Sequence, residues 1–428
     1  MDSMNRIAGA RRTMKAVFYS ICAALMLTTH TVVAFAASAY TLDDLLKLAL
    51  EQSPLITIAK AREDAASASM MTARAFSNPE LELGAGPTRY RTPGGQGSDG
   101  NWGVAISQPL EFSGVRQARQ EVAASNLKIA NLNTELTTFD LQIRIKAAFY
   151  DVLQRQDVLL LAEGDRNLLQ DISERVKVRV DVGESPRYEL IKADTEALAA
   201  ERDYQTAFTR VLESKAYLRG LVGNALPDSF GLIGEIPTDS SLPPISELVA
   251  RVPQTSQVVQ LRAAIETAEA KIKLQEKLRN PGLTLKAGIE QDPDLRQIRL
   301  GLAIPIPVWD QRRGQIMEAG AELREYQAML IERELSLGRD LNAAYQRYNV
   351  AKQQLDAFET GLLEQAESVL KVAESAYRFG ERGILDYLDA QRTYRSVRKD
   401  YQSARYAYIA AILEIEQLLG EQLVREKS

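Results

Sequence analysis

The stretch GLTLKAGIEQDPDLRQIRLGLAIPIP, residues 282–307, decides the fold. Large aliphatic residues alternate in it with small or charged ones, and the alternation resumes after a turn-like segment at 291–297. A period of two is typical of strands, so the stretch predicts a β-hairpin at about 282–307 with one aliphatic face. The aliphatic set is Leu283, Leu285, Ala287, Ile289, Ile298, Leu300, Leu302, Ile304 and Ile306.

An earlier stretch, at about 80–109, predicts a second hairpin of the same kind. Its apolar residues again occupy every other position, on both sides of a Gly-rich loop. They are Leu81, Leu83, Ala85, Trp102, Val104 and Ile106, and they alternate with Glu80, Glu82, Gly84, Gly103, Ala105 and Ser107. The chain therefore contributes four strands that share one two-faced pattern.

Two kinds of sheet have such faces: the edge of a soluble sandwich and the wall of a transmembrane β-barrel. The charged residues Lys286, Glu290 and Arg299 all fall on one alternate set, as in a wall with one lipid face. The only two tryptophans, Trp102 and Trp309, are expected at strand ends, where an interfacial aromatic belt would place them. These features favour the wall. Because four strands cannot close a barrel and an open edge is not tolerated in lipid, several chains must share one barrel.

Internal repeats predict that the chain is a tandem duplication of about two hundred residues. Several short motifs return in the same order. Ser53-Pro54 returns as Val252-Pro253, Asn78-Pro79 as Asn280-Pro281, and Gly183-Glu184 as Gly380-Glu381. We expect a first repeat at 37–222, a Pro/Gly/Ser-rich linker at 223–244 and a second repeat at 245–428.

The rest of each repeat has helical periodicity. No proline occurs between Pro109 and Pro186 or after Pro307, and apolar residues recur at alternating spacings of three and four. The clearest stripe is Ala390, Tyr394, Val397, Tyr401, Ala404, Tyr408, Ala411, Ile415 and Leu418, and the first repeat has Leu141, Ile145, Ala148, Val152 and Leu159. One helix over 113–182 would extend about 105 Å.

Each repeat is expected to reverse direction once, in a long helical hairpin. The tips are predicted at 182–190 and 379–388. Gly183 and Gly380 suit a helix C-terminal turn that needs a positive φ. Locally, an ordinary helical hairpin accounts for these residues.

The first 36 residues predict a signal peptide. Arg6, Arg11, Arg12 and Lys15 precede an apolar run, and small-x-small sites predict cleavage near Ala36 or Ala39. An N-terminal membrane anchor is the alternative, but the run is short for a spanning helix. Cys22 lies inside the run in a poor context for lipoprotein cleavage, so we expect a non-lipidated protein.

Composition excludes most enzyme classes. Among 428 residues there is one cysteine, Cys22, and one histidine, His30, and both lie in the predicted signal peptide. Without them, Cys/His zinc sites, thiol catalysis, Ser-His-Asp triads and disulfides are excluded. We expect no catalytic residues, no metal site and no cofactor. The net charge is −5 and becomes more negative once the basic leader is removed, which argues against nucleic-acid binding.

The ordered motifs resemble the TolC family of outer membrane efflux ducts over essentially the whole mature chain. They are TLDDL at 41–45, SP at 53–54, NP at 78–79, SQPLE at 107–111, NP at 280–281, IPIP at 304–307 and LDAQR at 388–392. The resemblance implies a mainly α protein with a membrane β part in the outer membrane of a Gram-negative bacterium, extending into the periplasm. It also implies a homotrimer, in which a shared 12-stranded β-barrel, four strands per chain, is continued by a long α-helical coiled-coil barrel.

Two longer motifs, QPLEFSG at 108–114 with Arg116 and PIPVWDQRRG at 305–314, resemble the heavy-metal branch, the CzcC-type component of tripartite resistance-nodulation-division (RND) pumps. This implies a passive duct for heavy-metal cations whose partners are a periplasmic adaptor (membrane fusion protein), an inner membrane RND pump and outer membrane lipid. Efflux of drugs or other organic compounds stays open, and so does a periplasmic coiled-coil adaptor or structural protein.

The resemblance also implies roles for residues at the tips. Gly183 and Gly380 match glycines that face the adaptor. Asp386 and Asp389 match paired acids that ring the pore constriction, and Tyr377 and Arg382 match residues whose contacts lock the gate.

Overall fold

The computed structural model of the chain describes residues 39–89, 98–223, 225–280, 282–293 and 295–423. The chain divides into two units. One consists of Met1–Tyr40 and Asp228–Gly231, and its described part contains β1 (Ala39–Tyr40), which pairs with β4 (Gly231–Leu232). The predicted signal peptide, with Cys22 and His30, lies outside the described residues. The other unit, Thr41–Pro227 and Leu232–Ser428, contains the four-stranded sheet and the helices of the described residues.

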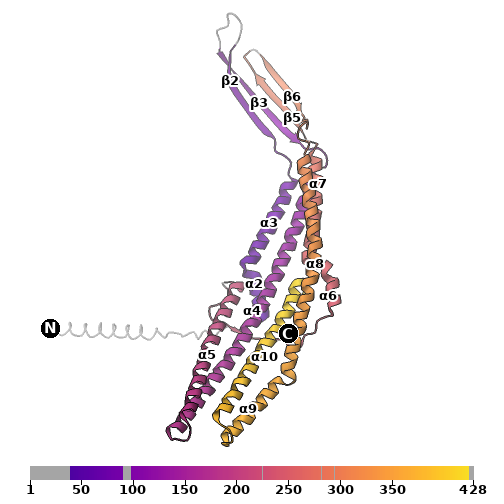
Figure 1. Cartoon of the computed structure of the whole chain (residues 1–428). Helices are drawn as coiled ribbons and strands as arrows, with labels where there is room; N and C mark the ends of the chain where they lie inside the picture. Colours follow the sequence, from indigo (N-terminus) through magenta and orange to yellow (C-terminus); the bar gives the residue numbers. More distant parts are fainter. Residues whose placement is uncertain (1–38, 90–97, 224, 281, 294, 424–428) are drawn as a thin grey trace, which may run out of the picture. The chain divides into compact units, whose positions relative to one another are not determined.

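Four strands form one antiparallel sheet, as predicted (Figure 1). They are β2 (Glu80–Arg89), β3 (Ser98–Leu110), β5 (Leu283–Gln291) and β6 (Arg296–Ala303), in the order β2-β3-β5-β6. The prediction for the last strand was wrong at both ends. Arg296 and Gln297 belong to β6 rather than to the turn, and β6 stops at Ala303 because Pro305 and Pro307 cannot donate to a ladder.

The register gives the sheet its two faces. Side chains directly across the ladder lie on the same face. One such row is Leu83, Val104, Ile289 and Ile298, and a second is Leu81, Ile106, Ala287 and Leu300. The next row, on the opposite face, is Glu82, Ala105, Gly288 and Arg299, and Arg299 forms a 3.1 Å ion pair with Glu290. No described segment covers the apolar face, since Leu300 is 83% exposed.

The tryptophans are not at strand ends, contrary to the prediction. Trp102 lies inside β3, opposite Ala85 of β2 and Gln291 of β5. The β2–β3 ladder continues past it because backbone pairing does not require large side chains, so a Gly-rich sequence that resembles a loop stays paired. Trp309 follows the end of β6 and is 95% exposed.

Two long helices, α4 (Val115–Asp181) and α5 (Arg187–Val222), form the first hairpin. The single long helix predicted at 113–182 is confirmed: α4 has 67 residues and a length of about 100 Å. Leu141, Ile145, Ala148 and Val152 of its predicted stripe are buried.

The second hairpin differs from the first. It consists of α9 (Leu363–Arg378) and α10 (Ile384–Leu419), and α9 follows α8 (Arg313–Ala357) through a π-helical turn, η2 (Phe358–Leu362). The sequence did not predict this break. Gly361 leaves helical geometry, and Thr360 Oγ1 donates to the carbonyl of Asp356 at 2.6 Å, a back-bond that bends helices.

Shorter helices complete the unit: α2 (Leu42–Gln52), α3 (Pro54–Arg74), α6 (Ile245–Arg251), the 3₁₀ turn η1 (Val252–Gln254) and α7 (Ser256–Leu278). Thr41 and Asp44 form a capping box on α2, and Ser53 caps α3 in front of Pro54. α3 and α7 pack on α4. Among the described residues, no helix is both long enough and apolar enough to cross a membrane.

Candidate functional site

Both hairpins reverse through the same kind of turn. The first tip, residues 182–186, and the second tip, residues 379–383, each place a glycine in the left-handed region: Gly183 has a φ of 81° and Gly380 a φ of 75°. Glu184 N donates to the carbonyl of Arg179 at 2.8 Å and Glu381 N to that of Ala376 at 2.9 Å, so the turn supplies a donor to a carbonyl in the last turn of each helix. The predicted positive φ is confirmed, but both turns are shorter than predicted: residues 187–190 belong to α5 and residues 384–388 to α10.

Asp386 and Asp389 lie in the first two turns of α10. They are three residues apart and therefore share a face of the helix, and both are exposed. Asp386 is in the first turn, where the helix dipole stabilises a negative charge. It forms an exposed ion pair with Arg382 at 3.6 Å.

Tyr377 connects three helices. Its hydroxyl accepts a hydrogen bond from Arg179 Nη1 of α4 at 3.2 Å, and the Arg179 guanidinium lies 5.2 Å from the ring centroid. The ring is stacked on Tyr387 of α10 with 5.8 Å between centroids. The two residues of the predicted lock thus have separate partners, because Tyr377 binds Arg179 whereas Arg382 binds Asp386. Arg179 and Tyr387 were missed in the sequence.

An apolar cluster next to the tips joins the two hairpins. Its buried members are Leu169, Ile172 and Val176 of α4, Ala193 and Ala200 of α5, and Ile384, Tyr387 and Leu388 of α10. Tyr387 and Leu388 lie between the two aspartates in sequence but face the first hairpin. The face of α10 that carries Asp386 and Asp389 is therefore turned away from that cluster.

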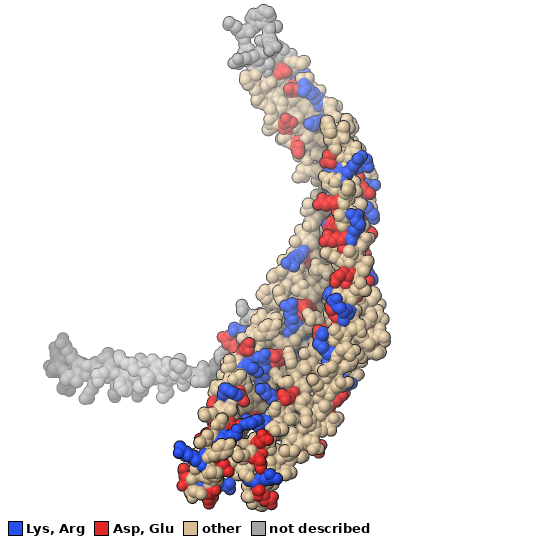
Figure 2. Space-filling view, viewed as in Figure 1, with Lys and Arg blue, Asp and Glu red and all other residues tan. Residues whose placement is uncertain are grey.

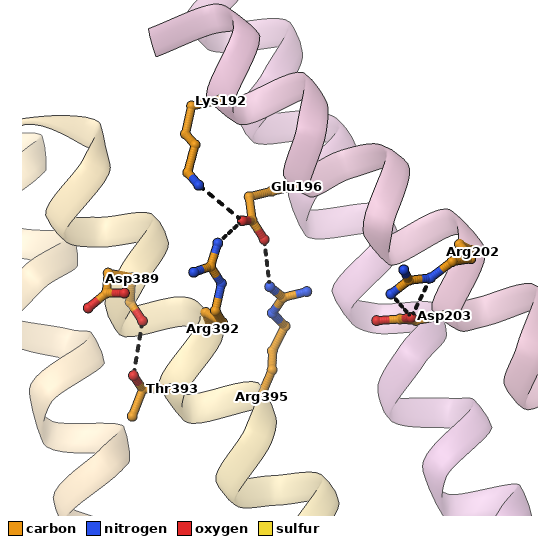
Figure 3. Close-up of polar contacts among 8 residues, drawn as sticks. All are labelled: Lys192, Glu196, Arg202, Asp203, Asp389, Arg392, Thr393 and Arg395. Carbon is orange, nitrogen blue, oxygen red and sulfur yellow. Dashed lines mark hydrogen bonds and ion pairs between the residues drawn. The ribbon is translucent and has the colours of Figure 1, made fainter. Parts of the chain in front are cut away.

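A charged cluster, not predicted from the sequence, lies beside the apolar one. Glu196 of α5 has a side chain only 7% exposed and sits in the inward stripe between Ala193 and Ala200. Its carboxylate pairs with Arg392 and, at 3.1 Å, with Arg395, both of α10, and it lies 3.9 Å from Lys192 (Figure 3). A glutamate at an inward position of a small-residue stripe is the signal that could have revealed it.

The charged side chains of the described part of the chain are distributed along the helices and the sheet. There, no three His, Cys, Asp or Glu side chains gather closely enough to hold a metal ion. On the face seen in Figure 2, acidic and basic side chains are intermingled rather than gathered in one basic patch.

The sequence profile of the outer membrane efflux protein family matches residues 45–224 and 253–421. The chain belongs to this family. Members are outer membrane efflux channels and not enzymes, so the resemblance to the TolC family and the outer membrane location predicted from the sequence are confirmed.

This efflux protein is similar to characterised relatives along most of its length. It is 25% identical to the cobalt-zinc-cadmium resistance protein CzcC of Cupriavidus metallidurans, over 90% of this chain and 91% of that protein. It is 23% identical to the outer membrane protein TolC of Vibrio cholerae, over 89% and 91% of the two chains. A crystal structure of CusC, described in connection with folding and transmembrane channel formation, matches with a TM-score of 0.72 at 16% identity, over 90% and 93% of the chains.

Proposed function

We propose that this efflux protein is a passive homotrimeric duct of a tripartite RND system and that it exports heavy-metal cations. The observation that carries the proposal is the two-faced sheet, with its uncovered apolar face and its two unpaired edges, β2 and β6. Its partners would be a periplasmic adaptor, an inner membrane pump and outer membrane lipid.

Strand number supports three chains. In lipid every backbone polar group must be paired, so the edges of the sheet have to meet the edges of further copies. Two copies would give eight strands, and the interior of an eight-stranded barrel is filled by side chains. Three copies give a twelve-stranded barrel, the smallest multiple of this sheet with room for a passage. The polar face, with Glu82, Lys286 and Arg299, would then line the lumen.

The helices also present exposed apolar residues. On α9 and its flanks, four apolar residues that are 44–79% exposed follow one another at spacings of seven, three and seven residues. They are Leu362, Val369, Val372 and Phe379. On α5, Ile191, Leu198 and Leu212 recur at multiples of seven and are 53–72% exposed. Such spacing is typical of coiled-coil seams. We propose that these seams pack against neighbouring copies and continue the duct beyond the membrane.

The tips would form the entrance. Asp386 and Asp389 from three chains would place six carboxylates around one axis and concentrate negative potential in a narrow passage. Tyr377 and Arg382, through their bonds to Arg179 and Asp386, would hold the entrance shut. Gly183 and Gly380 would shape the turns that face the adaptor. Trp102 and Trp309 would lie at the two membrane interfaces.

The two profile matches support the further proposal that the chain is a duplication. The two matched ranges, 45–224 and 253–421, lie almost entirely within the repeats expected at 37–222 and 245–428, and the first extends two residues into the linker expected at 223–244. Each repeat would then supply one β-hairpin and one helical hairpin.

The charge of the proposed entrance and the similarity to known proteins both bear on the substrate. An acidic entrance suits cations, and the relative CzcC is named for resistance to cobalt, zinc and cadmium. Likeness alone does not separate metals from organic compounds, because the pyoverdine export outer membrane protein OpmQ of Pseudomonas putida is nearly as similar, at 24% identity over 89% of this chain. Efflux of organic compounds is therefore the second candidate. Growth of a strain that lacks the gene, in graded zinc, cobalt or cadmium salts and in graded dye, separates the two: sensitivity to metals alone supports the proposal, and sensitivity to dye alone contradicts it.

Matched substitutions test the barrel. Leu302 faces the apolar side of β6 and its neighbour Gly301 the polar side, and a Cβ at Gly301 would meet only ordinary contacts. Leu302→Arg should impair membrane assembly by about 2–4 kcal/mol if the site lies near the bilayer midplane, whereas Gly301→Arg adds the same charge and should assemble. Heat-sensitive trimer bands from outer membrane fractions measure this. Equal tolerance on both faces would contradict the barrel, and release of the protein by osmotic shock would favour a periplasmic adaptor.

A further inference from the structure

Two opposite charges are neighbours on the exposed side of α10. Asp389 and Arg392 are three residues apart, a spacing at which a carboxylate and a guanidinium on a helix commonly pair. If they paired, Arg392 would cancel the negative charge of Asp389.

The structure directs Arg392 elsewhere. Its guanidinium reaches across to the first hairpin and binds Glu196 of α5, as Figure 3 shows. Within the described part of the chain, the carboxylate of Asp389 takes part in no ion pair. Only its backbone carbonyl accepts a hydrogen bond, from Thr393 Oγ1 at 3.1 Å.

Glu196 is well placed to hold Arg392. Its side chain is 7% exposed, so water screens its charge little, whereas that of Arg392 is 54% exposed. A hydrogen bond from Arg392 to Glu196, together with the charge of Glu196, raises the pKa of Arg392, and Asp389 adds a smaller contribution in the same direction. The two acids therefore compete for one guanidinium, and Glu196 has the greater share.

Glu196 also holds a second arginine. Arg395 is 14% exposed and donates to the other carboxylate oxygen at 3.1 Å. Asp165 of α4 also interacts electrostatically with Arg395, and it lies 3.9 Å from Arg398. Removing Glu196 alone would leave Arg395 buried without its main partner, so a clean test has to change both residues.

We propose that Glu196 sets the cation selectivity of the entrance by holding Arg392 away from Asp389. This inference rests on the proposed function, in which Asp389 lines the passage. It makes Glu196 a specificity-determining residue that acts from the other hairpin, without facing the passage itself.

The test uses a substitution pair that conserves net charge. Glu196→Gln with Arg395→Gln removes one acid and one base and leaves Arg392 free to pair with Asp389. In planar bilayers under a KCl gradient, the purified trimer with both changes should show a cation-over-anion permeability ratio lowered at least about twofold. Adding Arg392→Gln should restore the ratio.

The neighbouring pair Arg202 and Asp203 offers a matched control. Arg202 binds Asp203 at 2.7 Å on the surface of α5, without reaching α10 (Figure 3). Arg202→Gln with Asp203→Asn also removes one acid and one base and should leave selectivity unchanged. Trimer yield and helix content by circular dichroism show whether each variant is folded.

Asp389→Asn separates the inference from the proposed function. If it lowers selectivity while Glu196→Gln with Arg395→Gln does not, the inference is wrong and the acidic entrance stands. If Asp389→Asn changes nothing in an assembled trimer, both are wrong. A change of conductance without a change of selectivity in the Glu196 variant would make the cluster a mechanical brace and would also overturn the inference.

Discussion

Each repeat carries a glycine at an equivalent position before its tip, but the helix is continuous at one of these glycines and broken at the other. Gly164 lies inside α4, which continues unbroken for 67 residues. Gly361 occupies the equivalent place in the second repeat, because it follows Gly164 by as many residues as Gly380 follows Gly183. At Gly361 the helix is interrupted by the π-helical turn η2. A glycine therefore permits a break in a helix but does not cause one by itself.

The neighbours of the glycine make the difference. Thr360 back-bonds to Asp356, whereas Glu163 stands in its place in the first hairpin. Tyr401 of α10 holds the turn from outside: its hydroxyl lies 3.3 Å from a carboxylate oxygen of Glu359. Its ring is 6.1 Å from that of Phe358. π-helical turns inside α-helices are frequent at functional sites. We therefore infer that the first hairpin is rigid and that the second can bend at η2, between α8 and the residues proposed for the gate.

The largest effect is expected at the tips, where the hairpins are alike. Gly183→Val and Gly380→Val should each abolish efflux while leaving trimer yield intact, because a β-branched residue resists a positive φ and distorts the turn. A Cβ added at either glycine would have no described atom within 4 Å, so the substitutions test the backbone and not crowding. Metal sensitivity and crosslinking to the adaptor measure the outcome. Normal crosslinking in both variants would place docking elsewhere.

The next effect concerns the lock on the second hairpin. Tyr377→Phe with Arg382→Ser should loosen the entrance and raise single-channel conductance severalfold. Arg179→Ser removes the partner of the Tyr377 hydroxyl from the first hairpin and should act in the same direction. Unchanged conductance in both variants would mean that neither contact holds the entrance closed.

A smaller effect tests the bend at η2. Thr360→Ala with Gly361→Ala should favour a continuous helix, stiffen the second hairpin and lower efflux a few-fold, since the two local causes of the break are removed and only the contacts of Tyr401 remain. The counterpart Gly164→Ala lies in a regular helix and should stabilise the protein by about 1 kcal/mol without changing efflux. If the two variants behave alike in an efflux assay, the hairpins do not differ in function.

Periodic features of this chain were predictable from the sequence. The strands follow from alternation at Leu283–Gln291 and the long helix from the absence of proline between Pro109 and Pro186. The tip turns follow from Gly183 and Gly380. Each depends on neighbours close in sequence, where side-chain spacing and backbone preference act directly.

Contacts between the hairpins were not predictable in the same way. Glu196 and Arg395 are 199 residues apart, and a surface acid and a buried one look the same in a single sequence. The break at Gly361 escaped prediction for a related reason, because its cause includes Tyr401, 40 residues further on across the hairpin. The same limit hid Arg179 as the partner of Tyr377.

The smallest effect concerns Asp165, which ties the stiff first hairpin to α10. Burial raises the pKa of this carboxyl above the usual 3.8, although Arg395 and Arg398 oppose the shift. A raised pKa means that the folded state binds the proton more tightly, so this group favours folding below about pH 3.8 and the benefit is lost as pH rises through the raised pKa. Asp165→Asn should therefore slightly raise the midpoint of thermal unfolding at pH 7 and leave it unchanged near pH 3.5. A lower midpoint at pH 7 would show that the ion pair with Arg398 outweighs burial.

The most direct test of the central claim, an acidic entrance carried by the second hairpin of a trimeric duct, is selectivity in planar bilayers. Asp386→Asn with Asp389→Asn removes six carboxylates from the trimer while leaving the contacts of Tyr377 in place. We predict that the aperture stays largely closed, and that cation selectivity and block by multivalent cations both weaken. The claim is contradicted if the assembled double variant keeps the selectivity and the cation block of the unmodified protein.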